Sequence, residues 1–422
     1  MAIQQARILL ATVGSLGDLH PMIALAIELR RRGHEVTVAS TEFYRRKIES
    51  LGIAFHALRP NRSMDDPELF RYLLDARNGP EFVISKVLLS ALHDSYADLS
   101  AAAKSADFMV AGELLFAAPI VAEKMGLRWA SVILSPSSFF SPHDPSVIAP
   151  APFTRYLLDK GEWLNRAIIN LMQWAARKWA APIHELRAEL GLRASAKPLF
   201  EDKFSPYLNL AMFSPLLARP QPDWPASTVQ TGFIFFDKQQ NETELSGELR
   251  KFLDAGEPPV VFTLGSGAVV YPGTFYQESI EALRSIGRRA VLLVGGNAPK
   301  EHLPEGVVSF DYAPYSELLP RAACVVHSAG AGTLAQALRA GHPQLVMPFV
   351  FDQPDNAARC ERLGVGRFIS RSRYSAKRVA TELQRLLNDP EYSRRAAAVA
   401  QQISAEDGLR AACDAIQHTQ AA

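Results

Sequence analysis

The sequence predicts an α/β protein built from two Rossmann-like, doubly wound domains that face each other across a cleft. Short apolar runs alternate with amphipathic helical patterns in the first half of the chain, which is typical of a parallel sheet covered by helices. A stretch with four prolines, SPLLARPQPDWPAST at residues 214–228, then interrupts the pattern, as a domain linker does. The alternation restarts after it, and a chain of 422 residues is long enough for two separate cores.

The first half begins with ARILLATVG (6–14), whose run of apolar residues predicts a strand buried on both faces. A helix is expected to follow from Pro21, a residue favoured in the first turn, to Gly33. Residues 151–191 depart from the alternation and predict a long amphipathic helical segment. The same criteria predict further strands at residues 35–40, 53–58, 106–112, 128–134 and 207–213.

The second half repeats the alternation and ends in a helical tail from about residue 375. These patterns predict strands at residues 259–267, 289–297, 307–314, 324–332, 343–350 and 366–370. The predicted boundaries are 1–215 for the N-terminal Rossmann-like domain, 216–245 for a linker, 246–400 for the C-terminal Rossmann-like domain and 401–422 for a C-terminal helical tail.

Composition and charge exclude several classes of protein. Lys and Arg (45) nearly balance Asp and Glu (44), so the chain has no strong positive electrostatic potential that would attract a nucleic acid. Its three cysteines are far apart and form no zinc or disulfide framework, which favours a reducing cytoplasm. The N-terminal apolar run is too short for a signal peptide, and no run of 18 apolar residues predicts a membrane span.

Polar and glycine-rich loops follow several predicted strands, where ligands bind in open parallel sheets. These are GSLGDLHP with Gly17, Asp18 and His20, LGSG with Gly265 and Ser266, DYAP with Tyr312 and Ala313, HSAGAGT from His327 to Thr333, and FDQPDN with Asp352 and Gln353. Each has a structural alternative. Asp18 and Asp352 could cap helices, Gly265 could form a plain turn, and His327 and Tyr312 could be core residues.

One of these loops has the form of a dinucleotide fingerprint. Gly330-x-Gly332-x-x-Ala335 is followed about 20 residues later by Asp352, which is the pattern of an NAD site. The fingerprint normally occupies the first strand–helix turn of its unit, whereas here it follows the fourth predicted strand of the second half. An NAD(P)-dependent oxidoreductase is therefore an alternative function rather than the preferred one.

Three stretches carry a family resemblance: GSLGDLHP (14–21), PDWPASTVQTGFIFFD (222–237) and residues 311–366, which contain VVHSAGAGT and FDQPDN. They resemble the family 1 glycosyltransferases of the GT-B fold, a group with bacterial macrolide, sterol and rhamnolipid-type sugar transferases. The resemblance covers nearly the whole chain. It implies inverting transfer of a hexose from a UDP- or TDP-linked sugar to a hydroxyl of an apolar or lipid-like acceptor. It also implies that residues 1–215 form an acceptor-binding domain and residues 246–400 a nucleotide-sugar-binding domain. A non-catalytic sugar-nucleotide binding protein is a second alternative function.

The resemblance also implies roles for individual residues. Asp18 would be the catalytic base, with His20 as the alternative, and Tyr312 would stack on the nucleobase. Asp352 and Gln353 would contact the hydroxyls of the donor sugar. The diphosphate would be held by the loop of Ser328, Ala329, Gly330, Gly332 and Thr333, together with Gly265 and Ser266. The family's phosphate-binding histidine aligns with Ser328, so His327 and Ser328 are both candidates for the β-phosphate contact.

The acceptor side is less well defined by the sequence. Glu113, Ser137, Phe139 and Phe140 lie at strand ends of the first half and are the candidate acceptor-binding residues. Trp163, Trp174 and Trp179 could extend an apolar channel, with a role in core packing as the alternative. We expect no cofactor. We also expect no metal ion, since the chain contains no Asp-x-Asp, the element by which the other large glycosyltransferase fold holds Mn²⁺. The expected partners are a nucleoside-diphosphate sugar and an apolar acceptor that carries a hydroxyl. Weak association with a membrane surface is also expected.

Overall fold

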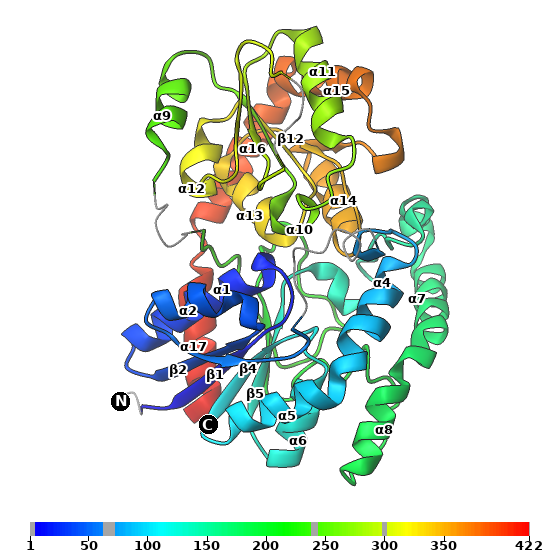
Figure 1. The fold of residues 1–422 in the computed structure, drawn as a ribbon. Helices are drawn as coiled ribbons and strands as arrows, with labels where there is room; N and C mark the ends of the chain where they lie inside the picture. Colours follow the sequence, from blue (N-terminus) through cyan, green and yellow to red (C-terminus); the bar gives the residue numbers. More distant parts are fainter. Residues whose placement is uncertain (1–4, 62–71, 238–243, 298–301, 422) are drawn as a thin grey trace.

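The computed structural model describes residues 5–61, 72–237, 244–297 and 302–421 of the chain. It contains two parallel sheets, one above the other in Figure 1, each flanked by helices. This is the expected fold class, two Rossmann-like domains of the GT-B type, and all the predicted strands form. The domain of the first sheet is called the first domain below, and that of the second sheet the second domain.

The first sheet has seven strands in the order β3-β2-β1-β4-β5-β6-β7. They are β1 (Arg7–Ala11), β2 (Glu35–Ser40), β3 (Ala54–Ala57), β4 (Phe108–Gly112), β5 (Trp129–Ile133), β6 (Leu208–Ala211) and β7 (Thr228–Gln230). The main helices of this domain are α1 (Leu16–Arg31), α2 (Arg45–Ser50), α5 (Leu92–Ala103) and α6 (Ala117–Met125). The strand order reverses between β1 and β4, so the loops after these strands border the crevice where ligands bind in such sheets.

The second sheet has six strands in the order β10-β9-β8-β11-β12-β13. They are β8 (Val260–Thr263), β9 (Ala290–Leu293), β10 (Val307–Phe310), β11 (Cys324–His327), β12 (Gln344–Val346) and β13 (Gly366–Phe368). The helices up to the last strand are α9 (Gly247–Asp254), α10 (Gly265–Ala268), α11 (Phe275–Ile286), α12 (Tyr315–Leu318), α13 (Ala331–Ala340) and α14 (Gln353–Leu363). Here the order reverses between β8 and β11, so the loops after these two strands lie at the second crevice.

Two segments that were predicted to form a linker and a C-terminal tail are part of the first domain. Residues 228–230, within the predicted linker 216–245, form β7 at the edge of the first sheet. The chain then runs through α15 (Ala376–Asn388) and α16 (Pro390–Ser404) in the second domain and returns to the first as α17 (Gly408–Ala421). The apolar face of α17, including Cys413 and Ile416, is buried in the core of the first domain.

The chain thus crosses between the domains twice, and the two crossings touch. Ser214 Oγ donates a hydrogen bond to Glu406 Oε1 (2.5 Å). A Cβ atom added at Gly408 would lie 2.4 Å from the carbonyl oxygen of Phe233, and one added at Gly232 would lie 2.7 Å from Glu406 Oε2. Glycine is therefore required at both positions for the two crossing segments to pack side by side.

The predicted helical segment at 151–191 is broken into shorter pieces. Two 3₁₀ turns precede α7 (Glu162–Ala176), which begins after Gly161, a residue with a positive φ of 117°. A third 3₁₀ turn separates α7 from α8 (Ala181–Glu189), which has a proline in its first turn. Opposite this segment, α4 (Gly79–Glu81) leads into a π-helical stretch, Phe82–Leu88. Within the described residues, no helix has both the length and the apolar character needed to cross a membrane.

Candidate active site

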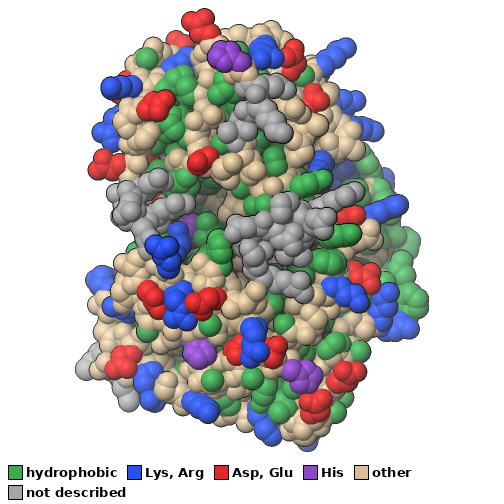
Figure 2. All heavy atoms as spheres, in the orientation of Figure 1, with side chains coloured by type: hydrophobic (Ala, Val, Ile, Leu, Met, Phe, Trp, Pro, Cys, Tyr) green, Lys and Arg blue, Asp and Glu red, His purple; other side chains and the backbone are tan. Residues whose placement is uncertain are grey.

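A cavity of about 1410 Å³ lies between the two domains, and Figure 2 shows the surface hollowed at their junction. Its walls include the loops after β1, β4, β8 and β11, the four strands that border the two order reversals. The residues from the glycine-rich loops that line it are Gly17, Asp18, His20, Gly265, Ser266, Tyr312, Ser328, Gly330, Gly332, Thr333, Asp352 and Gln353. The structure therefore brings these candidate residues together from both domains.

Asp18 lies in the first turn of α1 rather than in a loop. The helix starts at Leu16, five residues before the predicted start, because Ser15 caps it. Asp18 Oδ2 accepts hydrogen bonds from Ser15 N (2.8 Å) and Ser15 Oγ (3.1 Å), which completes a capping box. A Cβ atom at Gly14 would lie 2.5 Å from Asp18 Oδ2, so only glycine leaves room for this carboxylate.

Asp18 has the electrostatics of a general base. Burial raises its pKa to about 6, the nearby charge of Glu113 adds to the rise, and the hydrogen bonds from Ser15 oppose it. At neutral pH the carboxylate is therefore mostly ionised but is a stronger base than an exposed aspartate. A base with a pKa near the working pH is best suited to accept a proton during a reaction.

His20 also lines the cavity, but as a neutral side chain. Burial lowers its pKa to about 3, and the charge of Lys47 lowers it further. Its ring packs edge-on against Phe236 with 5.4 Å between ring centroids, and Nε2 is buried with no hydrogen-bond partner among the described residues. With so low a pKa, His20 is a poor proton acceptor. Of the two titratable side chains in this segment, Asp18 is therefore the better candidate to accept a proton.

The N-terminus of α13 is open toward the cavity. Gly330 is its N-cap residue, and no side chain caps it, so the first N–H groups of the helix have no partner within it. Gly330, Ala331, Gly332 and Thr333 all line the cavity. A Cβ atom at Gly332 would lie 3.8 Å from the Cα of Gly17, so the first turns of α1 and α13 meet across the cleft. The first turn of α1 carries the Asp18 carboxylate. The first turn of α13 carries N–H groups that no residue of the helix accepts, at the positive end of the helix dipole.

The structure places His327 away from the cavity and so does not support it as the candidate for the β-phosphate contact. The residue is fully buried and does not line the cavity. Its Nδ1 accepts a hydrogen bond from the N–H of Ala329 (3.0 Å), so Nε2 carries the proton and donates it to Gln344 Oε1 (2.9 Å). Burial lowers its pKa to about 4. His327 is thus a neutral structural residue that holds the turn after β11.

Ser328, the other candidate for the phosphate contact, does line the cavity. Its hydroxyl donates to the carbonyl oxygen of Leu264 (3.0 Å) and so ties the end of β11 to the loop after β8. In that loop, Gly265 has a positive φ of 70°, and a Cβ atom there would lie 3.0 Å from Thr333 Oγ1. The two glycine-rich loops are therefore packed against each other with no room for a side chain between them.

Three further candidates are placed behind the cavity wall. Ala313, Ala329 and Phe139 do not line the cavity. Ala329 is buried in the left-handed region (φ 63°), where its carbonyl oxygen accepts a hydrogen bond from Asn356 Nδ2 (2.9 Å). Phe139 is stacked on Trp224, with 4.0 Å between centroids. All three residues pack in hydrophobic clusters instead, Ala329 and Phe139 in one and Ala313 in another, so the structure does not place them at the cavity surface.

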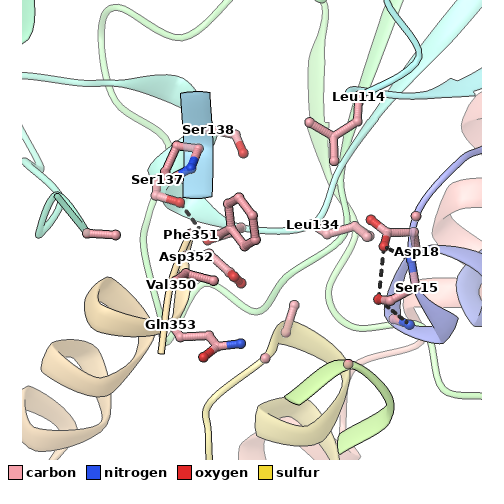
Figure 3. Close-up of a pocket in the computed structure, with 18 of the residues that line it drawn as sticks. Ser15, Asp18, Leu114, Leu134, Ser137, Ser138, Val350, Phe351, Asp352 and Gln353 are labelled. Carbon is pink, nitrogen blue, oxygen red and sulfur yellow. Dashed lines mark hydrogen bonds between the residues drawn. The ribbon is translucent and has the colours of Figure 1, made fainter. Parts of the chain in front are cut away.

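Asp352 and Gln353 lie in the middle of the cavity wall beside Phe351 (Figure 3). The Gln353 side-chain oxygen accepts a hydrogen bond from Phe349 N (2.8 Å), which leaves its NH₂ group as a donor. Asp352 Oδ2 accepts from Asn356 Nδ2 (2.8 Å). Burial raises the pKa of Asp352 to about 7, and the charges of Asp18 and Glu113 contribute. The pair presents an acceptor and a donor side by side, as recognition of adjacent hydroxyls requires.

Tyr312 lines the cavity at the end of β10, and its hydroxyl donates to the carbonyl oxygen of Asp237. The Asp237 carboxylate accepts hydrogen bonds from Ser316 N (2.6 Å) and Ser316 Oγ (3.2 Å). Asp237 also lines the cavity, and the motifs did not single it out as a site residue. Its place at the end of the resembling stretch 222–237 was the only available signal.

The first-domain wall contains an ion pair between a buried lysine, Lys203, and a partly exposed carboxylate, Glu113. Glu113 accepts hydrogen bonds from Lys203 Nζ (2.9 Å) and Ser138 Oγ (2.7 Å), and Lys203 Nζ lies 5.1 Å from the ring centroid of Phe140. Glu113, Ser137, Phe140 and Lys203 all line the cavity. Lys203 was missed because it is 90 residues from Glu113 in sequence and belongs to no motif.

Beyond this ion pair the cavity is apolar. Its wall there is formed by the π-helical stretch 82–88, the loop 147–154 and α7. Trp179 both contributes to this wall and packs against the core of the first domain. Trp163 and Trp174 do not line the cavity, since both are exposed on the outer side of α7. The cavity therefore has a polar end at the helix N-termini and a long apolar end in the first domain.

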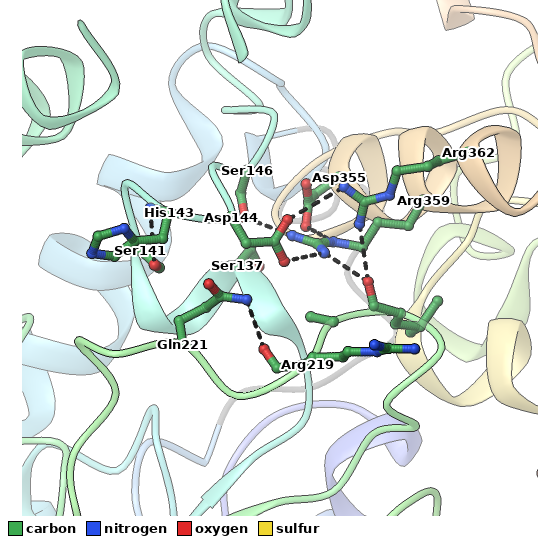
Figure 4. A network of polar contacts seen from close by, with 12 residues as sticks. Ser137, Ser141, His143, Asp144, Ser146, Arg219, Gln221, Asp355, Arg359 and Arg362 are labelled. Atoms are coloured by element: carbon green, nitrogen blue, oxygen red, sulfur yellow. Dashed lines mark hydrogen bonds and ion pairs between the residues drawn. The ribbon is translucent and has the colours of Figure 1, made fainter. Parts of the chain in front are cut away.

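An ion network joins the two domains beside the cavity (Figure 4). The Arg359 guanidinium on α14 contacts Asp355 Oδ2 and Asp144 Oδ2, both at 2.7 Å. Asp144 belongs to the loop after β5 in the first domain, and Arg362 contacts its other oxygen at 3.3 Å. Arg359 and Asp355 have only 2% of their side-chain surface exposed, whereas Arg362 has 57%. The network fixes the relative position of the domains near Asp352.

Comparisons with known proteins agree with this arrangement. Residues 8–136 match the model of the glycosyltransferase family 28 N-terminal domain, and residues 291–410 match that of the erythromycin biosynthesis protein CIII-like C-terminal domain. An O-mycaminosyltylonolide 6-deoxyallosyltransferase of Streptomyces fradiae is 32% identical over 97% of both chains. A vancomycin aglycone glucosyltransferase of Amycolatopsis orientalis is 31% identical over 85% of both chains. The crystal structure of the glycosyltransferase VinC in complex with dTDP superposes with a TM-score of 0.67 and 21% identity, covering 98% of this chain and 99% of VinC.

Proposed function

The chain belongs to the glycosyltransferase family that includes these macrolide and glycopeptide enzymes, and we propose that it transfers a hexose, with inversion, from a UDP- or TDP-linked sugar to a hydroxyl of an apolar small-molecule or lipid-like acceptor. One observation carries the proposal. The uncapped N-terminus of α13 and the Asp18 carboxylate face the same cavity from opposite domains. A diphosphate held at the first and a hydroxyl held at the second would have the sugar between them.

The donor would bind along the second-domain wall. Its diphosphate would accept hydrogen bonds from the N–H groups of residues 331–333 and from Ser266, at the positive end of α13. The ring of Tyr312 would stack on the nucleobase, and Asp352 and Gln353 would hold the sugar hydroxyls. The complex of VinC with dTDP supports a nucleoside diphosphate as the ligand of this fold.

Transfer would proceed by a single displacement. The acceptor oxygen attacks the anomeric carbon, its proton passes to Asp18, and the bond from that carbon to the diphosphate breaks on the opposite face. Base catalysis of this kind is worth roughly 10²–10⁴ in rate. The charge that develops on the departing diphosphate would be stabilised by the open N-terminus of α13, and a single preorganised donor is typically worth about 10²–10³. His20, being neutral, would orient the acceptor rather than take its proton.

We also propose that transfer requires no metal ion, because the α13 N-terminus supplies positive potential where the diphosphate leaves. Turnover should then be unchanged by an excess of EDTA. The control is the same assay with added magnesium or manganese. A rate that falls with EDTA and returns with either cation would contradict the proposal.

The NAD(P)-dependent oxidoreductase is no longer supported as an alternative, since the whole chain aligns with glycosyltransferases. A binding protein without activity is disfavoured by the Asp18 carboxylate, whose raised pKa suits proton transfer.

The experiment that tests the function is a thermal-shift panel of UDP, TDP, GDP, their sugars and NAD(H), followed by an assay for donor hydrolysis and transfer. A ligand at about 100 times its Kd stabilises the fold by about 2.7 kcal/mol. Stabilisation by NAD(H) and by none of the diphosphates would overturn the proposal.

The pH dependence of kcat/KM should follow the ionisation of Asp18. Its pKa is raised to about 6, and only the ionised form accepts a proton, so kcat/KM should rise with pH up to about 6 and fall about tenfold per unit below it. Asp352, with a pKa near 7 and coupled to Asp18, should add a second inflection. Asp352→Asn should remove that second inflection and leave the first near pH 6, because Asp352 is still mostly protonated where Asp18 ionises. A profile that is flat between pH 5 and 8 would contradict the assignment.

Asp352→Ala should weaken use of the donor sugar without weakening binding of the nucleoside diphosphate. A hydrogen bond to a charged group is worth about 1.5–3 kcal/mol, so kcat/KM for the sugar nucleotide should fall about 10- to 100-fold. Asn356 keeps its contact with the Ala329 carbonyl oxygen, which limits local damage. The measurement pairs steady-state kinetics with titration of UDP or TDP. Equal losses for the sugar nucleotide and the free diphosphate would exclude direct sugar contact.

A further inference from the structure

Large hydrophobic side chains are concentrated on the outer side of the segment that carries α7. Of the thirteen exposed large hydrophobic residues in the described chain, five lie within residues 153–174. They are Phe153, Tyr156, Trp163, Leu171 and Trp174, each between 61% and 73% exposed. The helix lies at the edge of the molecule in Figure 1, and Figure 2 shows hydrophobic side chains along that edge. Aromatic residues at this exposure are not needed to hold the fold, so they point to a partner.

Basic residues surround these side chains. Residues 155–178 contain five basic and two acidic side chains, whereas the whole chain is nearly neutral with a net charge of +1. The Arg177 guanidinium lies 4.4 Å from the ring centroid of Trp174, and that of Arg155 lies 5.5 Å from the ring centroid of Tyr156. A helix with Trp and Leu on its outer face and Arg and Lys beside them has the composition of a helix that lies in the interface of an anionic membrane.

This outer surface is continuous with the apolar end of the cavity. Phe153 and Leu171 are both exposed to solvent and part of the cavity wall. The next turns of α7 contribute Ile168 and Met172 to the same wall. One helix therefore separates the cavity from the outside and has apolar side chains on both sides.

We propose that residues 153–178 form a docking surface for an anionic lipid bilayer, with α7 lying parallel to it at headgroup depth. Trp163, Leu171 and Trp174 would enter the boundary between headgroups and acyl chains, and Arg177 would meet lipid phosphates. Arg166 and Lys178 would exchange their exposed ion pairs with Glu162 and Glu81 for contacts with the phosphates. Docking places the apolar end of the cavity against the membrane, so that a lipid-like acceptor reaches Asp18 without crossing water. The docking stands independently of enzymatic activity, and only the delivery of the acceptor rests on the proposed function.

The test is co-sedimentation of the full chain with vesicles of phosphatidylcholine alone and of phosphatidylcholine mixed with phosphatidylglycerol. We expect binding to the anionic vesicles that weakens with salt. The double variant Trp163→Ser/Trp174→Ser should weaken it by about tenfold or more. The charge variant Arg177→Gln/Lys178→Gln should weaken binding to anionic vesicles only. The matched control is Phe43→Ser, which removes an aromatic residue of similar exposure (54%) beside α2, on the far side of the first domain in Figure 1.

Three results would overturn the docking surface. The first is vesicle binding that the tryptophan and control variants reduce equally, and the second is no vesicle binding by the unaltered chain. The third is concentration-dependent dimerisation in gel filtration that the tryptophan variant abolishes, which would assign the surface to a second copy of the chain. Titration with UDP and TDP in the same variants separates the two proposals. Vesicle binding without diphosphate binding would leave the surface in place and remove the proposed function.

Discussion

Replacing Asp18 with Asn is expected to lower kcat by about 10²–10⁴-fold while binding of UDP or TDP persists. Asn has nearly the same shape, and its side-chain oxygen can still accept the hydrogen bonds from Ser15 that complete the helix cap. It cannot accept a proton from an acceptor hydroxyl. The measurement compares turnover with thermal-shift titration of the nucleoside diphosphate. If the variant keeps its turnover, Asp18 is not the base.

Ser15→Ala is the matched control because it removes the cap and leaves the carboxylate. Loss of an N-cap costs typically about 1 kcal/mol of stability, so its melting temperature should fall more than that of Asp18→Asn. Its turnover at pH 8 should stay far above that of Asp18→Asn. The pKa of Asp18 should rise further without the hydrogen bond from the Ser15 hydroxyl, although the backbone N–H of residue 15 still donates to Asp18, and this rise moves the acid limb of the pH profile upward. Equal losses of turnover in the two variants would mean that the cap, rather than the proton acceptor, is what the reaction needs.

Arg359→Met is expected to have the largest effect on stability, about 3–5 kcal/mol. Methionine fills a similar volume, but it leaves the carboxylates of Asp355 and Asp144 without the guanidinium that compensates them. The free energy of unfolding, measured with urea, should fall by this amount. Because the network spans both domains, the affinity for UDP or TDP should fall as well, since the cavity walls are no longer held together.

Arg362→Met serves as the control for this variant. Arg362 contacts the same Asp144 side chain but is 57% exposed, and exposed ion pairs contribute about 0–1 kcal/mol. A shift of similar size in both variants would show that removal of any charge next to Asp144, rather than burial of the guanidinium, determines the loss.

The two-sheet fold could be predicted because each strand and helix carries a local pattern of its own. The boundaries of the domains could not be predicted in the same way. The strand β7 has only three residues and lies directly after a proline-rich stretch, where no alternation is visible. The apolar face of α17 predicts burial, but nothing in it specifies which of the two sheets will cover it, because that depends on where the chain end lies in space.

The candidate site could be predicted largely from glycine-rich loops at strand ends, since the strand order brings such loops to one crevice. The failures come from side-chain direction. His327 is the last residue of β11, and neighbouring residues at a strand end point to opposite sides. Ser328 therefore faces the cavity, and His327 packs into the sheet. Glu113 and Lys203 form a pair that no local pattern reveals, because the two residues meet only after folding.

The paired crossings near Glu406 and Gly408 have a consequence for engineering this chain. Removing the last fifteen or so residues would resemble trimming a loose end, but it would strip a layer from the opposite half of the molecule and expose the apolar groove that Cys413 and Ile416 occupy. Because both connecting segments pass through one place, any rotation of one domain relative to the other must bend the two segments together, and this place would be the hinge. A bulky residue at Gly232 or Gly408 would therefore restrict rotation of the domains about this hinge without altering any group that contacts the substrates.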